Sequence, residues 1–263
     1  MGVKKNRKIQ KFIKTRRPLV CLTAYTKYMA EIIDSYCDLI LVGDSISMVL
    51  YGNENTSLVS LQTMINHGKA VRKGVSKSLL VVDMPKGSYE KSTKHALKNA
   101  KKIMNDTKCD AIKIEGGTKV KNIIKILVRN NIPVMGHIGL MPQQVYHLKD
   151  YRVKGRSSEE EQIIIDDLLA VQESGAFSVV IEAVPKTLAD KLCKMSKIKT
   201  IGIGASNKCD GQILVTEDML GFFDKNPKFV KKYAFLKNLL AKSVQNYKSD
   251  VISRKFPTKK NLY

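Results

Sequence analysis

The sequence predicts an α/β protein folded as a (β/α)8 TIM barrel. Eight short apolar segments rich in branched residues recur along the chain, and amphipathic segments with helical spacing lie between them. Strands that are apolar almost throughout are typical of a parallel sheet buried on both faces. The length of 263 residues is also that of one such barrel.

The predicted strands follow one another at fairly regular intervals. They are Leu19 to Thr23, Leu39 to Val42, Leu79 to Val82, Ala111 to Ile114, Pro133 to His137, Ser178 to Ile181, Thr200 to Ile203 and a weaker Gln212 to Val215. Helices are predicted at Lys91 to Asn105, Lys119 to Asn130, Glu159 to Ser174 and Lys186 to Met195. We expect a further helix from Asn226 to Leu240, so that residues 1–263 form one barrel domain with a C-terminal helical extension.

An open, doubly wound sheet is the alternative architecture. A sheet of that kind that bound a dinucleotide would need a glycine-rich turn after its first strand. The chain reads Ala24-Tyr25-Thr26 there, without GxGxxG, and it contains no GxxxxGK[ST] sequence. The sequence therefore gives no local support for nucleotide binding.

The chain is strongly basic, with a net charge of +22. Such a charge is compatible with a nucleic-acid surface, so a basic nucleic-acid-binding protein is the alternative outside the enzymes. Most of the basic residues, however, are lysines scattered along the chain, and the aromatic content is 6% without tryptophan. We therefore interpret the lysines as solvated surface residues and expect no nucleic-acid partner.

The sequence contains no membrane or secretion signal. No apolar run reaches the roughly 18 residues of a spanning helix, and the basic N-terminus lacks an apolar core. Five cysteines without a CxxC pair predict free thiols rather than a disulfide framework or a zinc site. We expect a cytoplasmic protein.

Charged and polar side chains stand at the ends of five consecutive predicted strands. They are Asp44, Asp83, Lys113 with Glu115, His137 and Glu182. Because a barrel builds its active site from the C-terminal ends of its strands, these side chains should meet at one mouth.

Most of these residues could also have a purely structural role when each is taken alone. Asp44 and Asp83 could cap a helix or a turn, and Lys113 and Glu115 could neutralise each other on one side of a strand. His137 could be an ordinary core histidine. Glu182 is the hardest to account for in this way, because it places a charge in an apolar stretch. Their joint occurrence favours a functional site.

Asp44, Asp83 and Glu115 offer hard oxygen ligands, which suit Mg²⁺. A 2-oxo acid can chelate such an ion, and the ion then stabilises an adjacent enolate. Glu182 on another strand is the candidate general base, and Lys113 can meet the substrate carboxylate.

Further blocks of residues carry a family resemblance. They include Leu22-Thr23-Ala24-Tyr25, Val42-Gly43-Asp44-Ser45, Asp83-Met84-Pro85, Ile112-Lys113-Ile114-Glu115-Gly116-Gly117, Gly136-His137-Ile138-Gly139-Leu140, Glu182-Ala183-Val184-Pro185 and Cys209-Asp210-Gly211-Gln212. From about Thr15 to Pro257 the chain resembles the ketopantoate hydroxymethyltransferase (3-methyl-2-oxobutanoate hydroxymethyltransferase) family.

The resemblance implies a barrel of the phosphoenolpyruvate/pyruvate superfamily, Mg²⁺ dependence and a large homo-oligomer. It implies transfer of a one-carbon unit from 5,10-methylenetetrahydrofolate to 3-methyl-2-oxobutanoate, the first committed step of pantothenate synthesis. By position, Asp44, Asp83 and Glu115 would bind Mg²⁺, and Asp44 and Asp83 would also take part in binding the substrate. Ser45 and Lys113 would hold the oxo acid, Glu182 would accept the proton, and His137 would support the site.

The chain departs from the family pattern near several of these blocks. The departures include Thr26, Ser47, Lys86, Met141 and Ser206, none of which is a predicted site residue. A Mg²⁺-dependent 2-oxo acid aldolase or carbon-carbon lyase of the same superfamily stays open as an alternative, because the fold does not fix the substrate.

Overall fold

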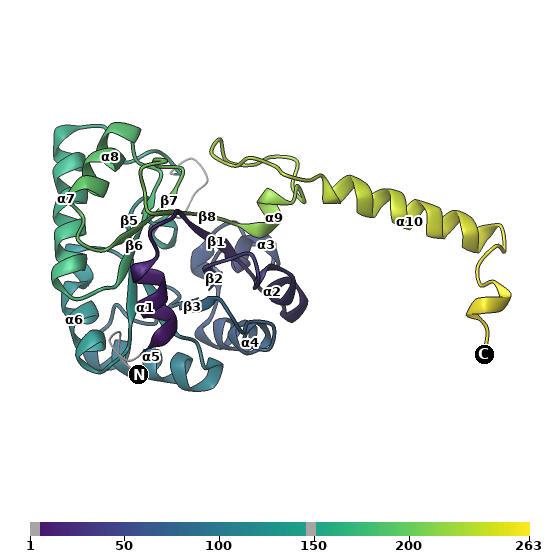
Figure 1. The fold of residues 1–263 in the computed structure, drawn as a ribbon, viewed down its shortest axis with the longest axis horizontal. Coiled ribbons are helices and arrows are strands. Elements are labelled where there is room, and N and C mark those ends of the chain that lie inside the picture. Colours follow the sequence, from purple (N-terminus) through teal and green to yellow (C-terminus); the bar gives the residue numbers. More distant parts are fainter. Residues whose placement is uncertain (1–5, 146–150) are drawn as a thin grey trace. The chain divides into compact units, whose positions relative to one another are not determined.

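Eight parallel strands close into a barrel in the computed structural model, which describes residues 6–145 and 151–263 (Figure 1). The strands are β1 (Leu19–Thr23), β2 (Leu39–Val42), β3 (Leu79–Asp83), β4 (Ala111–Glu115), β5 (Val134–Gly139), β6 (Ser178–Glu182), β7 (Lys199–Ile203) and β8 (Gly211–Leu214). The predicted fold class is confirmed, and so are all eight predicted strands.

One helix precedes the first strand, and helices that follow most of the strands cover the outside of the barrel. They are α1 (Arg7–Lys14), α2 (Lys27–Ile33), α3 (Ile46–Val49), α4 (Leu61–Arg72), α5 (Thr93–Thr107), α6 (Lys121–Arg129), α7 (Ser158–Glu173) and α8 (Lys186–Met195). The four helices predicted between the strands are confirmed. The connection between β7 and β8, residues 204–210, contains no helix.

Residues 216–263 form a second compact unit, separate from residues 1–215. It contains α9 (Thr216–Met219) and α10 (Leu236–Ile252). Whether the chain behaves as one barrel domain with a C-terminal helical extension stays a prediction. Among the described residues, no helix is long and apolar enough to cross a membrane.

The helix predicted from Asn226 to Leu240 is misplaced, because α10 starts only at Leu236. The segment before it forms hydrogen bonds to earlier residues of its own unit, besides one turn of its own between Val230 and Pro227. The Asn226 side chain donates to the Asp218 carbonyl, and the Tyr233 amide donates to the Met219 carbonyl at 2.8 Å. These bonds compete with a helix, which the amphipathic pattern alone does not reveal.

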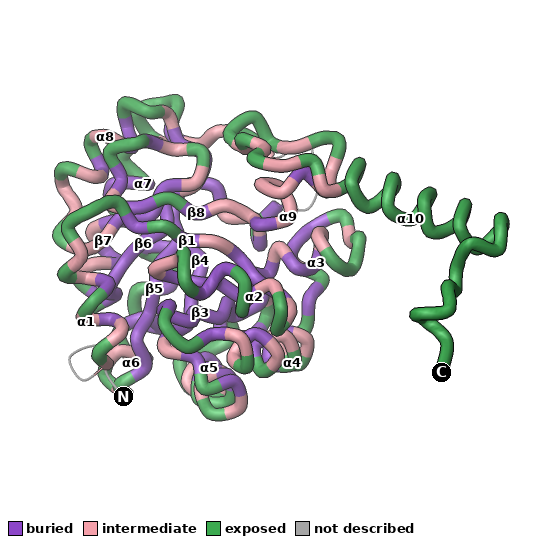
Figure 2. Tube along the Cα trace, turned by 45° about the vertical axis from the view of Figure 1, so that its right-hand side comes forward, coloured by how far each residue is buried: buried purple, intermediate pink, exposed green. Residues whose placement is uncertain are grey.

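Alternate residues of the strands point into the barrel and form its inner core. Leu79, Val81, Ala111, Met135 and Val180 belong to this set. Figure 2 shows the strands as mostly buried segments surrounded by helices with exposed outer faces. A second and larger apolar cluster lies between the strands and the helices.

The N-terminal helix α1 contributes to the inner core. Its Ile9 and Phe12 are buried with the inward-facing strand residues, and the Phe12 ring meets the Phe177 ring edge-on at 5.9 Å between centroids. Because Phe177 directly precedes β6, α1 lies at the N-terminal end of the barrel. The C-terminal end of the barrel, opposite α1, is therefore the end at which an active site can form.

The predicted site residues continue the inward-facing rows. Asp83 comes two positions after Val81, and His137 comes two positions after Met135, so each polar side chain lies on the same side of its strand as the apolar one before it. The strand register also pairs Asp83 with Lys113, and Glu115 with His137. The fold therefore gathers these polar residues at the C-terminal mouth.

Candidate active site

Lys113 and the two aspartates form one buried group at the mouth. Lys113 Nζ lies 2.8 Å from Asp83 Oδ1, and the backbone amide of Asp44 donates to Asp83 Oδ2 at 3.0 Å. All three residues are at most 5% exposed. Burial by itself would lower the pKa of the Lys113 amine. The nearby carboxylates of Asp83 and Asp44 outweigh burial and raise this pKa above its ordinary value. Lys113 is therefore a buried cation that already has a partner.

His137 lies between two carboxylates on the other side of the mouth. Its Nδ1 is 3.2 Å from Glu115 Oε1, and its Nε2 is 3.1 Å from Glu182 Oε2. Burial and Lys113 lower the pKa of His137, but Glu115 and Glu182 outweigh them and raise it to about 9. The ring is therefore an imidazolium at neutral pH, with one carboxylate on each nitrogen.

Gln143 joins the two groups, and the sequence analysis did not single it out. Its Nε2 donates to Asp44 Oδ2 at 2.7 Å, its backbone amide donates to Glu115 Oε2 at 3.0 Å, and its Oε1 accepts from the Tyr89 hydroxyl at 2.7 Å. The side chain is buried. One feature of the sequence could have indicated Gln143. It lies three residues after Leu140, where a block that resembles the family ends, and two residues after the departure at Met141.

Ser45 lies at the start of the short helix after β2. Its hydroxyl is 2.7 Å from the hydroxyl of Tyr25, which belongs to the first strand's loop and was also missed as a site residue. A side chain at Gly43 would put its Cβ 2.8 Å from Ser45 Oγ. Glycine at this position therefore keeps the serine hydroxyl next to the aspartates.

The negative charge of the mouth exceeds its positive charge. Four carboxylates (Asp44, Asp83, Glu115 and Glu182) face one lysine and one histidine. Burial, with Asp83 and Glu115 close by, raises the pKa of Asp44 well above its usual range. Burial also opposes ionisation of Glu115, yet His137 and Lys113 keep its pKa below the ordinary value. A divalent cation would balance the excess charge.

Two carboxylate oxygens of the mouth have lone pairs to spare. Asp83 Oδ1 and Glu115 Oε1 are buried, and each contacts a single ion-pair partner among the described residues, Lys113 Nζ at 2.8 Å and His137 Nδ1 at 3.2 Å. Within residues 6–145 and 151–263, no three His, Cys, Asp or Glu side chains are arranged to hold one ion by themselves. The donor set thus fits Mg²⁺, which commonly takes one or two carboxylates and completes its shell with water and substrate oxygens.

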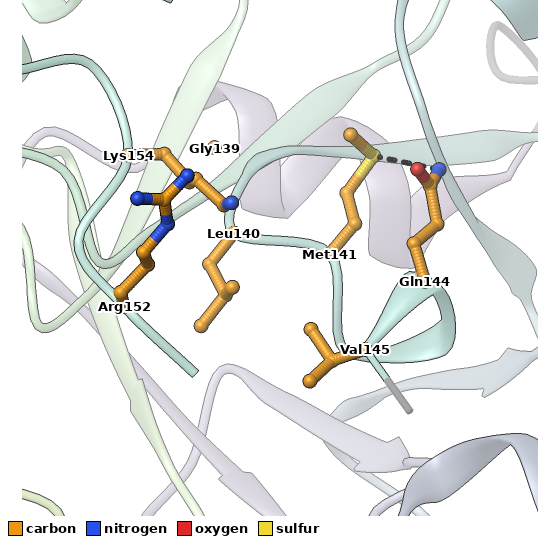
Figure 3. Close-up of a pocket in the computed structure, with 7 residues that line it drawn as sticks. All are labelled: Gly139, Leu140, Met141, Gln144, Val145, Arg152 and Lys154. Carbon is orange, nitrogen blue, oxygen red and sulfur yellow. Dashed lines mark hydrogen bonds between the residues drawn. The ribbon is translucent and has the colours of Figure 1, made fainter. Parts of the chain in front are cut away.

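A cavity of about 460 Å³ adjoins this mouth (Figure 3). Its lining consists of Gly139, Leu140, Met141, Gln144, Val145, Arg152 and Lys154. Sequence reasoning missed Arg152 and Lys154, because they lie between strands rather than at a strand end.

Two backbone hydrogen bonds attach this lining to the C-terminal end of β6. The Leu140 amide donates to the Glu182 carbonyl at 2.9 Å, and the Lys154 amide donates to the Ala183 carbonyl at 3.0 Å. At Gly139, with φ of +89°, a Cβ would come within 2.4 Å of the Glu182 carbonyl oxygen. The close approach requires glycine and places the cavity directly beside Glu182.

The structure thus brings six of the predicted site residues together at one end of the barrel, while the hydroxyl of the seventh, Ser45, contacts Tyr25. Asp44, Asp83 and Lys113 share one group, and Glu115, His137 and Glu182 share the other. Their individual roles are not tested by this placement.

Comparisons with known proteins cover almost the whole chain. The family model described as ketopantoate hydroxymethyltransferase matches residues 4–259. A 3-methyl-2-oxobutanoate hydroxymethyltransferase of Pelagibacter ubique is 49% identical over 98% of this chain and 100% of its own length. The protein of the same name from Rhizobium etli is 52% identical over 93% of this chain and 90% of its own.

Solved structures with this fold are much more distant in sequence. A phosphonopyruvate hydrolase in complex with oxalate and Mg²⁺ is 12% identical, with a TM-score of 0.66 over 99% of this chain and 93% of that one. A 2,3-dimethylmalate lyase of the PEP mutase/isocitrate lyase superfamily is 11% identical, with a TM-score of 0.59 over 94% and 88%. These likenesses confirm the barrel fold.

Proposed function

The chain belongs to the ketopantoate hydroxymethyltransferase family, and from this premise we propose how its barrel mouth transfers a hydroxymethyl unit to 3-methyl-2-oxobutanoate. The observation that carries the proposal is the position of Glu182. Its carboxylate is held by His137 at 3.1 Å, and its side chain is more exposed than those of the other acids of the mouth. It is thus the acid best placed to meet a substrate.

We propose that Asp44 and Asp83 hold Mg²⁺, with Glu115 as the third acid of the site. The excess negative charge and the spare lone pairs of Asp83 and Glu115 support this assignment. When bound, the ion supplies Lewis-acid chemistry, drawing electron density from the keto group of the oxo acid so that C3 becomes acidic.

Glu182 then removes the proton from C3 of the oxo acid. His137 acts through Glu182 rather than on the substrate, because its two ring nitrogens already face Glu182 and Glu115. As an imidazolium it fixes the direction of the Glu182 carboxylate. This makes Glu182 the catalytic residue and His137 a positioning residue.

Ser45 and Lys113 hold the oxo acid at its carboxylate end. The Ser45 hydroxyl, next to that of Tyr25, is only partly buried and can donate to an oxygen atom. Lys113 is paired with Asp83, so it contributes a positive charge close to the substrate while it stays in that pair.

The one-carbon donor, 5,10-methylenetetrahydrofolate, binds in the cavity beside Glu182. A volume of about 460 Å³ is in the range of ligand sites, roughly 300 to 1,000 Å³. Leu140 and Val145 offer apolar contacts, while Arg152 and Lys154 suit the carboxylates of the donor's glutamate tail. The carbon nucleophile made by Glu182 attacks the methylene carbon from the adjoining mouth. Both carbon–nitrogen bonds of that carbon break, water supplies the oxygen of the new hydroxyl group, and tetrahydrofolate leaves.

We propose further that the protein forms a homo-oligomer. Helix α10 has no buried residue, and its Leu240, Val244, Tyr247 and Val251 recur at helical spacing with large exposed fractions. An apolar face of this kind is typical of a contact between proteins. Light scattering should give a mass of several chains, and Val244→Asp should lower it while Ser249→Asp, on the opposite face, should not.

The proposed reaction is tested with the purified protein, Mg²⁺, 3-methyl-2-oxobutanoate and 5,10-methylenetetrahydrofolate. Mass spectrometry should detect ketopantoate, and omission of the donor should abolish it. Cleavage of the oxo acid without the donor would instead support the lyase or aldolase alternative. A donor deuterated at the methylene group should pass its label to the product.

A further inference from the structure

Two cysteines meet outside the barrel mouth. Cys193 lies near the C-terminal end of α8, and Cys209 lies in the connection between β7 and β8. Their sulfur atoms are 3.4 Å apart. Both residues belong to the barrel unit, and neither contributes to the proposed reaction.

A hydrogen bond between α8 and the connection that follows β7 keeps the two sulfur atoms in contact. One helical turn before Cys193, the Asp190 carboxylate accepts a hydrogen bond from the hydroxyl of Ser206. This bond joins α8 to the same connection that carries Cys209. Ser206, a departure from the family pattern, therefore has a structural role here.

Residues of β7 fix the pair from the other side. The Thr200 hydroxyl lies 3.7 Å from Cys193 Sγ and donates to Asp210 Oδ2 at 3.0 Å. A Cβ at Gly202 would come within 3.0 Å of Cys209 Sγ, so this glycine leaves room for the thiol. The two sulfurs are thus neighbours because three elements pack around them.

We propose that Cys193 and Cys209 form a dithiol site that small-molecule disulfides oxidise to an intramolecular disulfide. The bond requires the sulfurs to approach from 3.4 Å to about 2 Å. Cys193, as its thiolate, attacks one sulfur of the small disulfide and releases one thiolate. Cys209 then loses its proton, attacks the Cys193 sulfur of the mixed disulfide and releases the second thiolate. The small disulfide is reduced to two thiols, and the two protein thiols are oxidised.

The surroundings of the cysteines give the order of the two steps. The contact with the Cys209 thiol, against the effect of burial, lowers the pKa of Cys193 to about 7, while the same contact and burial raise the pKa of Cys209. Cys193 is also the less buried of the two. It is therefore the attacking thiol, and Cys209 is the resolving thiol.

The other three cysteines provide internal controls. Cys21 and Cys109 are buried. Cys37 is about as accessible as Cys193, but burial, with Asp38 and Asp34, raises its pKa to about 12. Oxidation by a disulfide should therefore be selective for the Cys193–Cys209 pair.

The test treats the full-length protein with oxidised glutathione and measures its intact mass. We expect a loss of about 2 Da and one tryptic cross-link, between the peptides of Cys193 and Cys209. Cys209→Ser should stop at the mixed disulfide and gain about 305 Da on Cys193. Cys193→Ser should give neither product, and Cys37→Ser should behave as the wild type.

Several outcomes would overturn the proposal. A wild-type protein that keeps all its thiols, or a cross-link that involves Cys37, would show that the pair is not the reactive site. Glutathione on Cys209 in Cys193→Ser, at the wild-type rate, would refute the assigned order. Because the wild-type cross-link is mapped directly, the result does not depend on how the variants fold.

Discussion

His137 Nε2 lies 3.1 Å from Oε2 of Glu182, at the point where β5 and β6 end side by side. The same ring reaches Glu115 through Nδ1 at 3.2 Å. A histidine with a carboxylate on each nitrogen has no free nitrogen with which to take a substrate proton. The geometry therefore supports the proposed division of roles, in which Glu182 is the base and His137 is the residue that holds it.

Glu182→Gln tests the base. Glutamine keeps the size of the side chain but cannot accept a proton, so the oxo acid should still bind while its C3 proton stops exchanging with deuterated solvent. A missing general base typically costs on the order of 100-fold or more. Proton NMR of the oxo acid in deuterated buffer with Mg²⁺ measures the exchange.

The control for this prediction is oxo-acid binding by calorimetry, which should be nearly unchanged in Glu182→Gln. Exchange at the wild-type rate in the variant would refute the assignment of Glu182.

His137→Gln tests the positioning role through its pH dependence. The folded-state pKa of about 9 lies above the ordinary 6.5, so the charged ring stabilises the fold fully below about pH 6.5. This contribution declines as the pH rises and is lost above about pH 9. Urea unfolding of metal-free protein should therefore show a gap between wild type and variant that closes over this interval. A gap independent of pH would contradict the role of the imidazolium.

Asp83→Asn tests both the metal site and the buried ion pair. The variant should bind Mg²⁺ more weakly and lose turnover, because a carboxylate ligand is gone. It should also be less stable by about 3 kcal/mol, since Lys113 would stay buried without its main partner. Calorimetric Mg²⁺ titration and urea unfolding measure the two effects.

The double variant Asp83→Asn/Lys113→Met separates these effects. Removing the buried cation should restore much of the stability while Mg²⁺ binding and turnover stay low. If the single variant kept wild-type Mg²⁺ affinity, Asp83 would not be a ligand.

The sequence predicted the barrel well because its strands are short and almost wholly apolar. It also located Asp44, Asp83, Glu115 and Glu182, since a barrel places a charge that follows a buried strand at its C-terminal mouth. The helix α1 went unpredicted: its Ile9 and Phe12 are spaced by three residues within a basic segment, and only the barrel core accounts for their burial.

The sequence could not identify residues whose roles depend on contacts between distant parts of the chain. Gln143 is an ordinary loop residue until the fold brings it to Asp44, which lies 99 positions away in the chain. The pairing of Cys193 with Cys209 likewise depends on how α8 packs against a loop without regular structure. Periodicity carries no information on either contact.

Asp34→Asn tests a structural carboxylate far from the mouth. Asp34 accepts the backbone amides of Ser76, Lys77 and Ser78 at 2.8 to 2.9 Å, and these bonds, against the effect of burial, hold its pKa well below its usual range. We expect a loss of about 1 to 3 kcal/mol at pH 7. Because the folded pKa is depressed, the gap should persist above about pH 4 and narrow as the pH falls further.

The matched control is Asp106→Asn, which changes an aspartate on the surface of α5 that forms an ion pair with Lys102. Its unfolding midpoint should stay close to that of the wild type, because an exposed pair is screened by water and salt. Equal effects of the two substitutions would mean that the hydrogen bonds of Asp34 contribute nothing specific.

Arg152→Gln and Lys154→Gln test whether part of the +22 charge serves the one-carbon donor. Both side chains line the cavity beside Glu182, so each substitution should raise the KM for a polyglutamylated donor several-fold, with a weaker dependence on salt than in the wild type. Exchange of the C3 proton needs no donor and should not change. Arg129→Gln, an exposed arginine at the end of α6, removes the same charge elsewhere and should leave the KM unaltered. If all three substitutions acted alike, the basic residues would be solvated surface charge, as the sequence alone suggested, and the cavity would not be the donor site.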